Sequence, residues 1–141
     1  DPRPRRASDE FGRTVHAAKS ACRWVTLGDG WHALSLIGNG WVVLKPADDG
    51  TWTVLRYPKR GKPIQEHAEL DLDWARAVGE GVARNLGAFG PMTRRAGWLD
   101  RPVSEKALSY GRMAGFPITE ETTAWQFTVM QAERNFPGWQ R

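Results

Sequence analysis

Apolar and polar residues alternate along the middle of the chain, in short runs separated by glycine-rich turns. The runs CRWVTL, WHALSLI, WVVLKP and TWTVLRY, within residues 22–57, are joined by GDG, GNG and ADDG. A period of two predicts β-strands, and tight glycine turns connect only adjacent antiparallel strands. A fifth run, PIQEHAEL at 63–70, is typical of an edge strand because it is charged and opens with proline. We therefore expect an antiparallel β-meander of four to five strands.

After the fifth run the hydrophobic period changes to that of a helix. In LDLDWARAVGEGVARNLG an apolar residue recurs every four positions, at Trp74, Val78, Val82 and Leu86. Asp71 or Asp73 is placed to cap the start of this helix, and Gly87 to end it. Gly79 and Gly81 each weaken a helix by about 1 kcal/mol relative to alanine. Packing against the sheet has to offset that cost, and small residues permit a close approach.

The C-terminal third of the chain predicts two further helices. SEKALSYGRMAG begins at Ser104, a favoured N-cap residue, and ends at Gly115. TAWQFTVMQAERNF begins with Thr123 and Gln126 in the spacing of a capping box. The FPITEET segment between them is a turn, so we expect a helical hairpin. The predicted class is α+β: an antiparallel meander covered by a helix, followed by a C-terminal helical hairpin.

The chain of 141 residues fits one domain with room for a second small module. We expect a flexible basic lead-in at 1–20, a meander-plus-helix domain at 21–90, and a connector with the helical hairpin at 91–141. The lead-in DPRPRRASDEFGRTV is rich in arginine and proline, which is typical of a linker, with a phosphate-contacting arm as the alternative. Because the first residue is Asp1 and not Met, we expect a piece of a longer protein.

Charge and composition restrict the classes of partner. The chain has 20 Lys and Arg against 16 Asp and Glu, a net charge of +4 that suits polyanionic partners. Mean hydropathy is −0.55, and no apolar run approaches the ~20 residues of a membrane helix, so no membrane contact is expected. Cys22 is the only cysteine, which excludes an internal disulfide and fits a reducing, cytoplasmic setting.

No motif of a catalytic, metal or cofactor site is present. The chain lacks a G-x-x-x-x-G-K-[ST] phosphate loop, a G-x-S-x-G nucleophile turn and an H-E-x-x-H metal helix. His16, His32 and His67 have no spacing that indicates a shared metal, and Cys22 is most simply a small core residue. We therefore expect a non-catalytic chain without cofactor or metal.

The predicted sheet is the best candidate for a functional surface because it combines aromatic and basic side chains. Aromatic rings stack on unpaired bases, and cations follow the phosphates of a nucleic-acid strand. Four tryptophans fall in predicted strands, Trp24 among them, and cations cluster where the fourth strand ends. The expected contact set is Trp31, Trp41, Trp52, Arg56, Tyr57, Lys59, Arg60 and Lys62, with Arg94 and Arg95 as second-tier candidates.

The same residues also have a plain structural explanation. Tryptophans on the inward face of a strand belong to the core, and cations at the end of a hairpin are typical of a solvated turn. Trp41 and Val43 share one face of their strand and Val42 and Leu44 the other, so both faces are apolar. The alternative function is therefore a protein-binding or intramolecular docking module. Its mark is an exposed apolar patch that contains the tryptophans, with dispersed cations.

The segment WLDRPVSEKALSYGRMAGFPITEETTAWQF resembles the C-terminal tail of bacterial, especially actinobacterial, superfamily 2 DEAD/DEAH-box helicases. The matching positions are Trp98, Arg101, Pro102, Ser104, Lys106, Leu108, the turn Gly115-Phe116-Pro117 and the cap formed by Thr123 and Gln126. Ala107 stands where that family prefers glutamine, and Trp125-Gln126-Phe127 replaces its Gly-Glu-Ala. The resemblance implies a C-terminal accessory module with a helicase core upstream, and it favours DNA as the partner of the basic, aromatic sheet. The stacking aromatic residues of that sheet favour single-stranded DNA.

Overall fold

The computed structural model describes residues 20–138, which form two compact units divided between Arg94 and Arg95. We refer to the part up to Arg94 as unit 1 and to the part from Arg95 as unit 2. The lead-in expected at 1–20 lies outside the described residues, apart from Ser20. Among the described residues, no helix is both long and apolar enough to cross a membrane.

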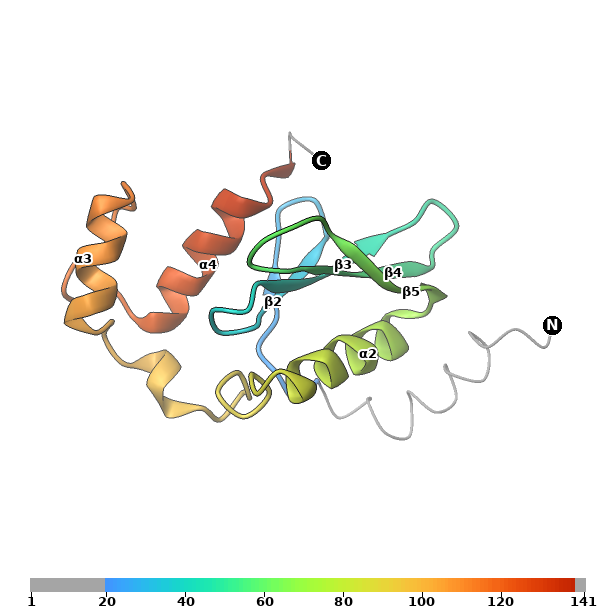
Figure 1. Cartoon of the computed structure of the whole chain (residues 1–141), viewed down its shortest axis with the longest axis horizontal. Helices are drawn as coiled ribbons and strands as arrows, with labels where there is room; N and C mark the ends of the chain where they lie inside the picture. The colour runs from blue at the N-terminus through green and yellow to red at the C-terminus, as the bar shows by residue number, and fades with distance from the viewer. Residues whose placement is uncertain (1–19, 139–141) are drawn as a thin grey trace. The chain divides into compact units, whose positions relative to one another are not determined.

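Unit 1 consists of a five-stranded antiparallel sheet followed by a helix (Figure 1). The strands are β1 (Val25–Thr26), β2 (His32–Ser35), β3 (Trp41–Pro46), β4 (Trp52–Tyr57) and β5 (Ile64–Leu70). Their order in the sheet is their order in the chain, as in a meander. The helix α2 (Leu72–Asn85) lies along one face of the sheet. The predicted α+β arrangement of a meander covered by a helix is therefore confirmed.

The central strand β3 is buried on both faces. Val42, Val43 and Leu44 are all fully buried. Val42 faces α2, whereas Trp41 and Val43 lie on the opposite face, where Tyr57 and Leu55 of β4 are their cross-strand partners. The sequence of this strand predicts apolar residues on both faces, and in the folded sheet these residues are buried on both faces.

Small residues of α2 make its contact with the sheet. Asp71 caps the helix by accepting a hydrogen bond from the backbone N of Trp74 at 2.9 Å. Ala75, Gly79 and Ala83 are the buried small residues of the helix. The row Trp74, Val78, Val82 and Leu86 is not the buried face: the first three are half-buried and Leu86 is exposed. The contact is shifted by one position because small side chains let the helix backbone approach the sheet.

Gly79 is the closest point of this approach. A Cβ added there would lie 2.6 Å from Cη2 of Trp24 and 3.0 Å from Cγ1 of Val42. At Gly81, two positions along the same helix, an added Cβ would meet nothing within 4 Å. Gly79 is therefore required by the packing of the helix on the sheet, whereas Gly81 only lowers the stability of the helix.

The two chain segments that enter and leave unit 1 pair with each other. The backbone N of Arg23 donates to the carbonyl oxygen of Met92 at 2.8 Å, and that of Arg94 donates to Ala21 at 2.9 Å. Cys22 and Thr93 form an antiparallel bridge between these two hydrogen bonds. The pairing joins residues about seventy positions apart and closes the unit beside the first strand.

Unit 2 contains the short helix η1 (Gly97–Asp100) and the helices α3 (Glu105–Met113) and α4 (Ala124–Asn135). Ser104 caps α3 by accepting from the backbone N of Ala107, and Thr123 and Gln126 form a complete capping box at α4. The rings of Phe116 and Phe127 pack edge to face at 5.2 Å. The two long helices begin where the capping patterns of the sequence predict, whereas η1 lies in the expected connector.

Gly79 and Gly81 give a matched test of the helix–sheet contact. We expect Gly79→Ala to destabilise the protein by about 1–3 kcal/mol, because the new methyl group overlaps Trp24 and Val42. Gly81→Ala should stabilise it by about 0.5–1 kcal/mol through helix propensity alone. Urea unfolding of both variants measures the difference, and equal effects of the two substitutions would contradict the close approach.

Candidate nucleic-acid interface

Alternate connections of a meander lie at opposite ends of its sheet, because each strand reverses the direction of the one before. One end is formed by the turn at 36–40, the loop at 58–63 and the C-terminal end of α2. Nδ2 of Asn39 lies 3.5 Å from the carbonyl oxygen of Leu86, which places the helix end beside the turn. The opposite end is formed by the turns at 27–31 and 47–51 and by the junction of β5 with α2.

The first of these ends collects the cations of unit 1, and we refer to it as the basic end. It comprises Arg23, Arg56, Lys59, Arg60, Lys62, Arg84 and Arg94. Lys59, Arg60 and Lys62 are exposed, and within the described residues no carboxylate forms an ion pair with any of them. No described neighbour therefore neutralises their charges.

The opposite end collects the carboxylates, and we refer to it as the acidic end. It comprises Asp29, Asp48, Asp49, Glu69, Asp71 and Asp73, with Lys45 and Arg76 as the cations nearby. In the described part of unit 1 the two remaining carboxylates are Glu66 and Glu80. Glu66 pairs with Arg56, whose Nε lies 2.7 Å from its Oε2, and Glu80 is buried. With the exception of the exposed Lys45, the described part of unit 1 thus carries its exposed charges of opposite sign at opposite ends of the sheet.

Two aromatic residues of the expected contact set lie at the basic end. Trp41 opens β3 and Tyr57 closes β4, and they are direct cross-strand partners. Both rings are half-buried. Tyr57 leads directly into the loop that carries Lys59, Arg60 and Lys62, so this aromatic pair and the exposed cations adjoin.

Gly40 fixes the turn at 36–40 against that loop. Its φ of +100° lies in a region of backbone conformation that favours glycine. A Cβ at this position would collide with the carbonyl oxygen of Tyr57 and lie 2.9 Å from the carbonyl carbon of Pro58. The turn and the basic loop therefore touch through their backbones, and their relative position does not depend on flexible side chains.

Two other tryptophans of the expected set lie away from these cations. Trp31 is the last residue of the turn at 27–31, directly before β2 and not in a strand, and its ring lies 5.6 Å from Nζ of Lys45. Trp52 opens β4, and its ring lies 5.3 Å from that of His32. Both are at the acidic end, separated from the basic loop by the length of a six-residue strand, roughly 17 Å. Trp24 precedes β1 instead of lying in a strand, and it packs on Gly79.

The two second-tier candidates belong to different units. Arg94 comes to the basic end through its backbone bond to Ala21, and its carbonyl oxygen accepts from Nη2 of Arg23 at 3.4 Å. Arg95 opens unit 2 and is exposed. The sequence patterns do not indicate that Arg23 and Arg84 join the same end, since this follows from long-range pairing and from the direction of α2.

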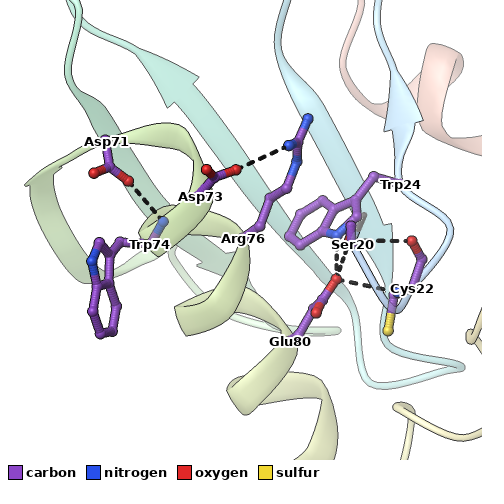
Figure 2. A network of polar contacts seen from close by, with 8 residues as sticks. All are labelled: Ser20, Cys22, Trp24, Asp71, Asp73, Trp74, Arg76 and Glu80. Carbon is purple, nitrogen blue, oxygen red and sulfur yellow. Dashed lines mark hydrogen bonds and ion pairs between the residues drawn. The ribbon is translucent and has the colours of Figure 1, made fainter. Parts of the chain in front are cut away.

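A buried carboxylate holds the entering segment of unit 1 against α2 (Figure 2). Oε2 of Glu80 accepts hydrogen bonds from Nε1 of Trp24 at 2.9 Å, from the backbone N of Cys22 at 3.2 Å, and from the hydroxyl of Ser20. From the helical pattern alone, Glu80 is expected on the solvated face of the helix. That expectation is wrong: Glu80 is buried, because its hydrogen-bond partners lie more than fifty positions away in the chain. With three donors on one oxygen, its role in the fold is structural.

Cys22 lies beside this carboxylate and is unreactive. Burial of the thiol is the main cause that raises its pKa to about 12, and the negative charge of Glu80 raises it further against a smaller opposing effect of Arg84. A cysteine with this pKa is a thiol at neutral pH and not a nucleophilic thiolate. Among residues 20–138, no group of three or more His, Cys, Asp or Glu side chains is placed to hold a metal ion.

Comparison of the chain with models of protein families, with curated proteins and with solved structures found no match in any of the three.

Glu80 gives a test of the buried network. We expect Glu80→Ala to destabilise the protein by about 2–4 kcal/mol, because it leaves the Trp24 indole and the Cys22 amide without their acceptor. Asp48→Ala, in an exposed turn, should change stability by less than about 0.5 kcal/mol. The free energy of urea unfolding, followed by tryptophan fluorescence, measures both. A loss for Glu80→Ala no larger than that of the control would contradict the structural role.

His32 gives a pH dependence with a defined sign. Burial first, and the positive charge of Arg76 second, lower the pKa of His32 below its ordinary value of 6.5. The unfolded chain therefore binds this proton more tightly than the folded chain does. The free energy of unfolding is unaffected above about pH 6.5 and falls as the pH drops from there through the lowered pKa of the folded state. Urea midpoints between about pH 7.5 and pH 5 should show this loss, and His32→Gln should reduce it. His67→Gln, at an exposed position, should leave it in place, and equal effects of the two would contradict the assignment.

Proposed function

We propose that unit 1 binds a nucleic-acid strand at its basic end, without catalysing a reaction on it. The observation that carries this proposal is the segregation of charge along the sheet. Lys59, Arg60 and Lys62 lie exposed in one loop, and the carboxylates at their end of the sheet are either paired with an arginine or buried. A strand of phosphates approaching this end meets positive charge, with no exposed, unpaired carboxylate among the described residues of that end.

The side chains around this loop fit the contacts of a strand binder. Lys59, Arg60 and Lys62 would contact phosphates, while Trp41 and Tyr57 adjoin them with partly accessible rings. Trp31 and Trp52 are left out of this proposed interface because they lie at the acidic end. Arg94 extends the cationic row to the other side of the turn at 36–40.

The helicase-like segment supports a proposal for the kind of protein in which unit 1 binds the strand. Residues 98–127 resemble tails that follow the motor of superfamily 2 helicases, and the matching Ser104 and Thr123 are helix caps in unit 2. We therefore propose that the chain is an accessory module of a DNA helicase or a related DNA-processing protein. Its partners would be DNA, with a single strand favoured, and the motor of the same protein.

A docking module is the second candidate, and one observation favours it. Ile37, Ile64 and Leu86 are exposed by 41%, 42% and 38%, and all three lie at the basic end. A protein partner with acidic and apolar groups would fit such a mixed surface. These three exposed residues include no tryptophan, and the cations beside them are gathered, whereas a docking surface is expected to expose the tryptophans among dispersed cations.

The proposal is tested by fluorescence anisotropy with labelled single- and double-stranded oligonucleotides at several salt concentrations. For three phosphate contacts on a single strand, the slope of log K against log salt is expected to be about −2. The variant Lys59→Ala/Arg60→Ala/Lys62→Ala should bind about tenfold or more weakly at low salt, with a slope nearer zero.

The matched control removes cations from the other end of the same unit. Lys45→Ala/Arg76→Ala should keep most of the affinity and the full salt slope, because both side chains lie near the acidic end. Binding by neither strand type at low salt would rule out the proposed function and leave the docking module. An equal loss in the loop variant and in the control would show that only net charge matters.

A further inference from the structure

The turn at 36–40 carries a backbone conformation that its residue does not favour. Ile37 has a φ of +50° and is followed by Gly38 at +82°, and the backbone N of Asn39 donates to the carbonyl oxygen of Leu36 at 3.3 Å. Two consecutive positive φ angles are the mark of the tight turns that favour Asn-Gly in hairpins. A β-branched residue at the first of these positions is an outlier, and it costs stability relative to asparagine or glycine.

Burial accounts for only part of this isoleucine. Its side chain is 41% exposed, although Leu36 beside it is fully buried. A Cβ added at the next residue, Gly38, would meet nothing within 4 Å, so the tip of the turn is open. The turn therefore holds an apolar residue at its tip in a strained conformation, with about two fifths of its surface left accessible.

The position of the tip is fixed relative to the cations of the basic end. Gly40 abuts the backbone of Tyr57 and Pro58, which lead into the loop with Lys59 and Arg60. On the other side, the turn belongs to the hairpin that joins β2 to β3, and β1 with the paired Arg94 follows at the sheet edge. Cations thus lie on both sides of the exposed isoleucine, along one end of the sheet.

We infer that Ile37 inserts between neighbouring bases of the single strand that the basic end binds, while the flanking cations hold its phosphates. This inference rests on the proposed function and adds the part of the ligand that is contacted, namely the faces of unpaired bases. Apolar side chains held between base steps are an established means of unstacking them. A preformed turn presents the side chain without an ordering cost at the moment of binding.

A single strand is favoured over a duplex for an energetic reason. Insertion into a duplex costs a few kcal/mol for each unstacked step, and proteins offset that cost with extensive contacts to bent DNA. In the described residues, the basic end offers one exposed loop of three cations, the neighbouring arginines and a few exposed apolar side chains, which is little surface for that purpose. Unpaired bases separate at lower cost, and their faces are already accessible.

The test uses the full chain, oligonucleotides with 2-aminopurine at an internal position, and the substitution Ile37→Asn. The fluorescence of 2-aminopurine rises when the base is unstacked, so wild-type protein should raise it in the single strand. Ile37→Asn relieves the strain, and its urea midpoint should be higher than that of the wild type. It should nevertheless bind the single strand about fivefold more weakly, with the 2-aminopurine signal lost and the salt slope unchanged, since no charge is removed.

Ile64→Asn is the matched control, because Ile64 is equally exposed at the same end but lies in the edge strand β5, where its pairing with Arg56 places it in extended backbone and not in a turn. It should leave the 2-aminopurine signal in place, and Ile37→Gly should behave like Ile37→Asn. Unchanged binding and signal in Ile37→Asn, with the wild-type salt slope retained, would overturn the insertion and leave the proposed function standing. Tighter binding of the duplex, with the signal rising only there, would overturn the assignment to a single strand. If the wild-type protein bound neither oligonucleotide, both the insertion of Ile37 and the proposed function would be ruled out.

Discussion

The contact at Gly79 and Glu80 is the constraint on which unit 1 depends. Gly79 brings the backbone of α2 against Trp24 and Val42, and the adjacent Glu80 accepts hydrogen bonds from the segment that enters the unit. One helical turn therefore positions both the helix on the sheet and the first strand beside it. Because the direction of α2 and the course of the first segment are set here, so are the places of Arg84 and Arg23 at one end of the sheet.

The separation of charge follows from meander topology combined with turn composition. Acidic side chains occur in the turns GDG and ADDG and in the LDLD junction, whereas cations occur in PKRGK. A meander places the first three at one end and the last at the other. The macrodipole of α2 is matched to this arrangement at both termini, with Asp73 in its first turn and Arg84 in its last. Charge and fold are therefore consistent with each other along the whole unit.

Local sequence patterns predicted most strands and helix starts. The features that they did not predict depend on contacts between residues far apart in the chain. The runs bounded by glycine became strands, and the caps at Ser104 and Thr123 start helices as expected. The inward face of α2 was not predictable from its apolar row, since a close approach buries Ala75 and Ala83 instead. The division of the tryptophans between the two ends was implicit in the meander. Arg94, by contrast, reaches the basic end through pairing with Ala21, which no local pattern encodes.

That pairing has a mechanical consequence. The chain enters unit 1 at Ala21 and leaves it at Arg94, and the two strands of this passage run antiparallel across the Cys22–Thr93 bridge. Tension applied along the chain would load these hydrogen bonds one at a time, as in opening a zipper, and not all together in shear. While this pairing holds, tension passes across it from Ala21 to Arg94 and the five-stranded sheet bears none of the load; once it opens, the load falls on the sheet and α2.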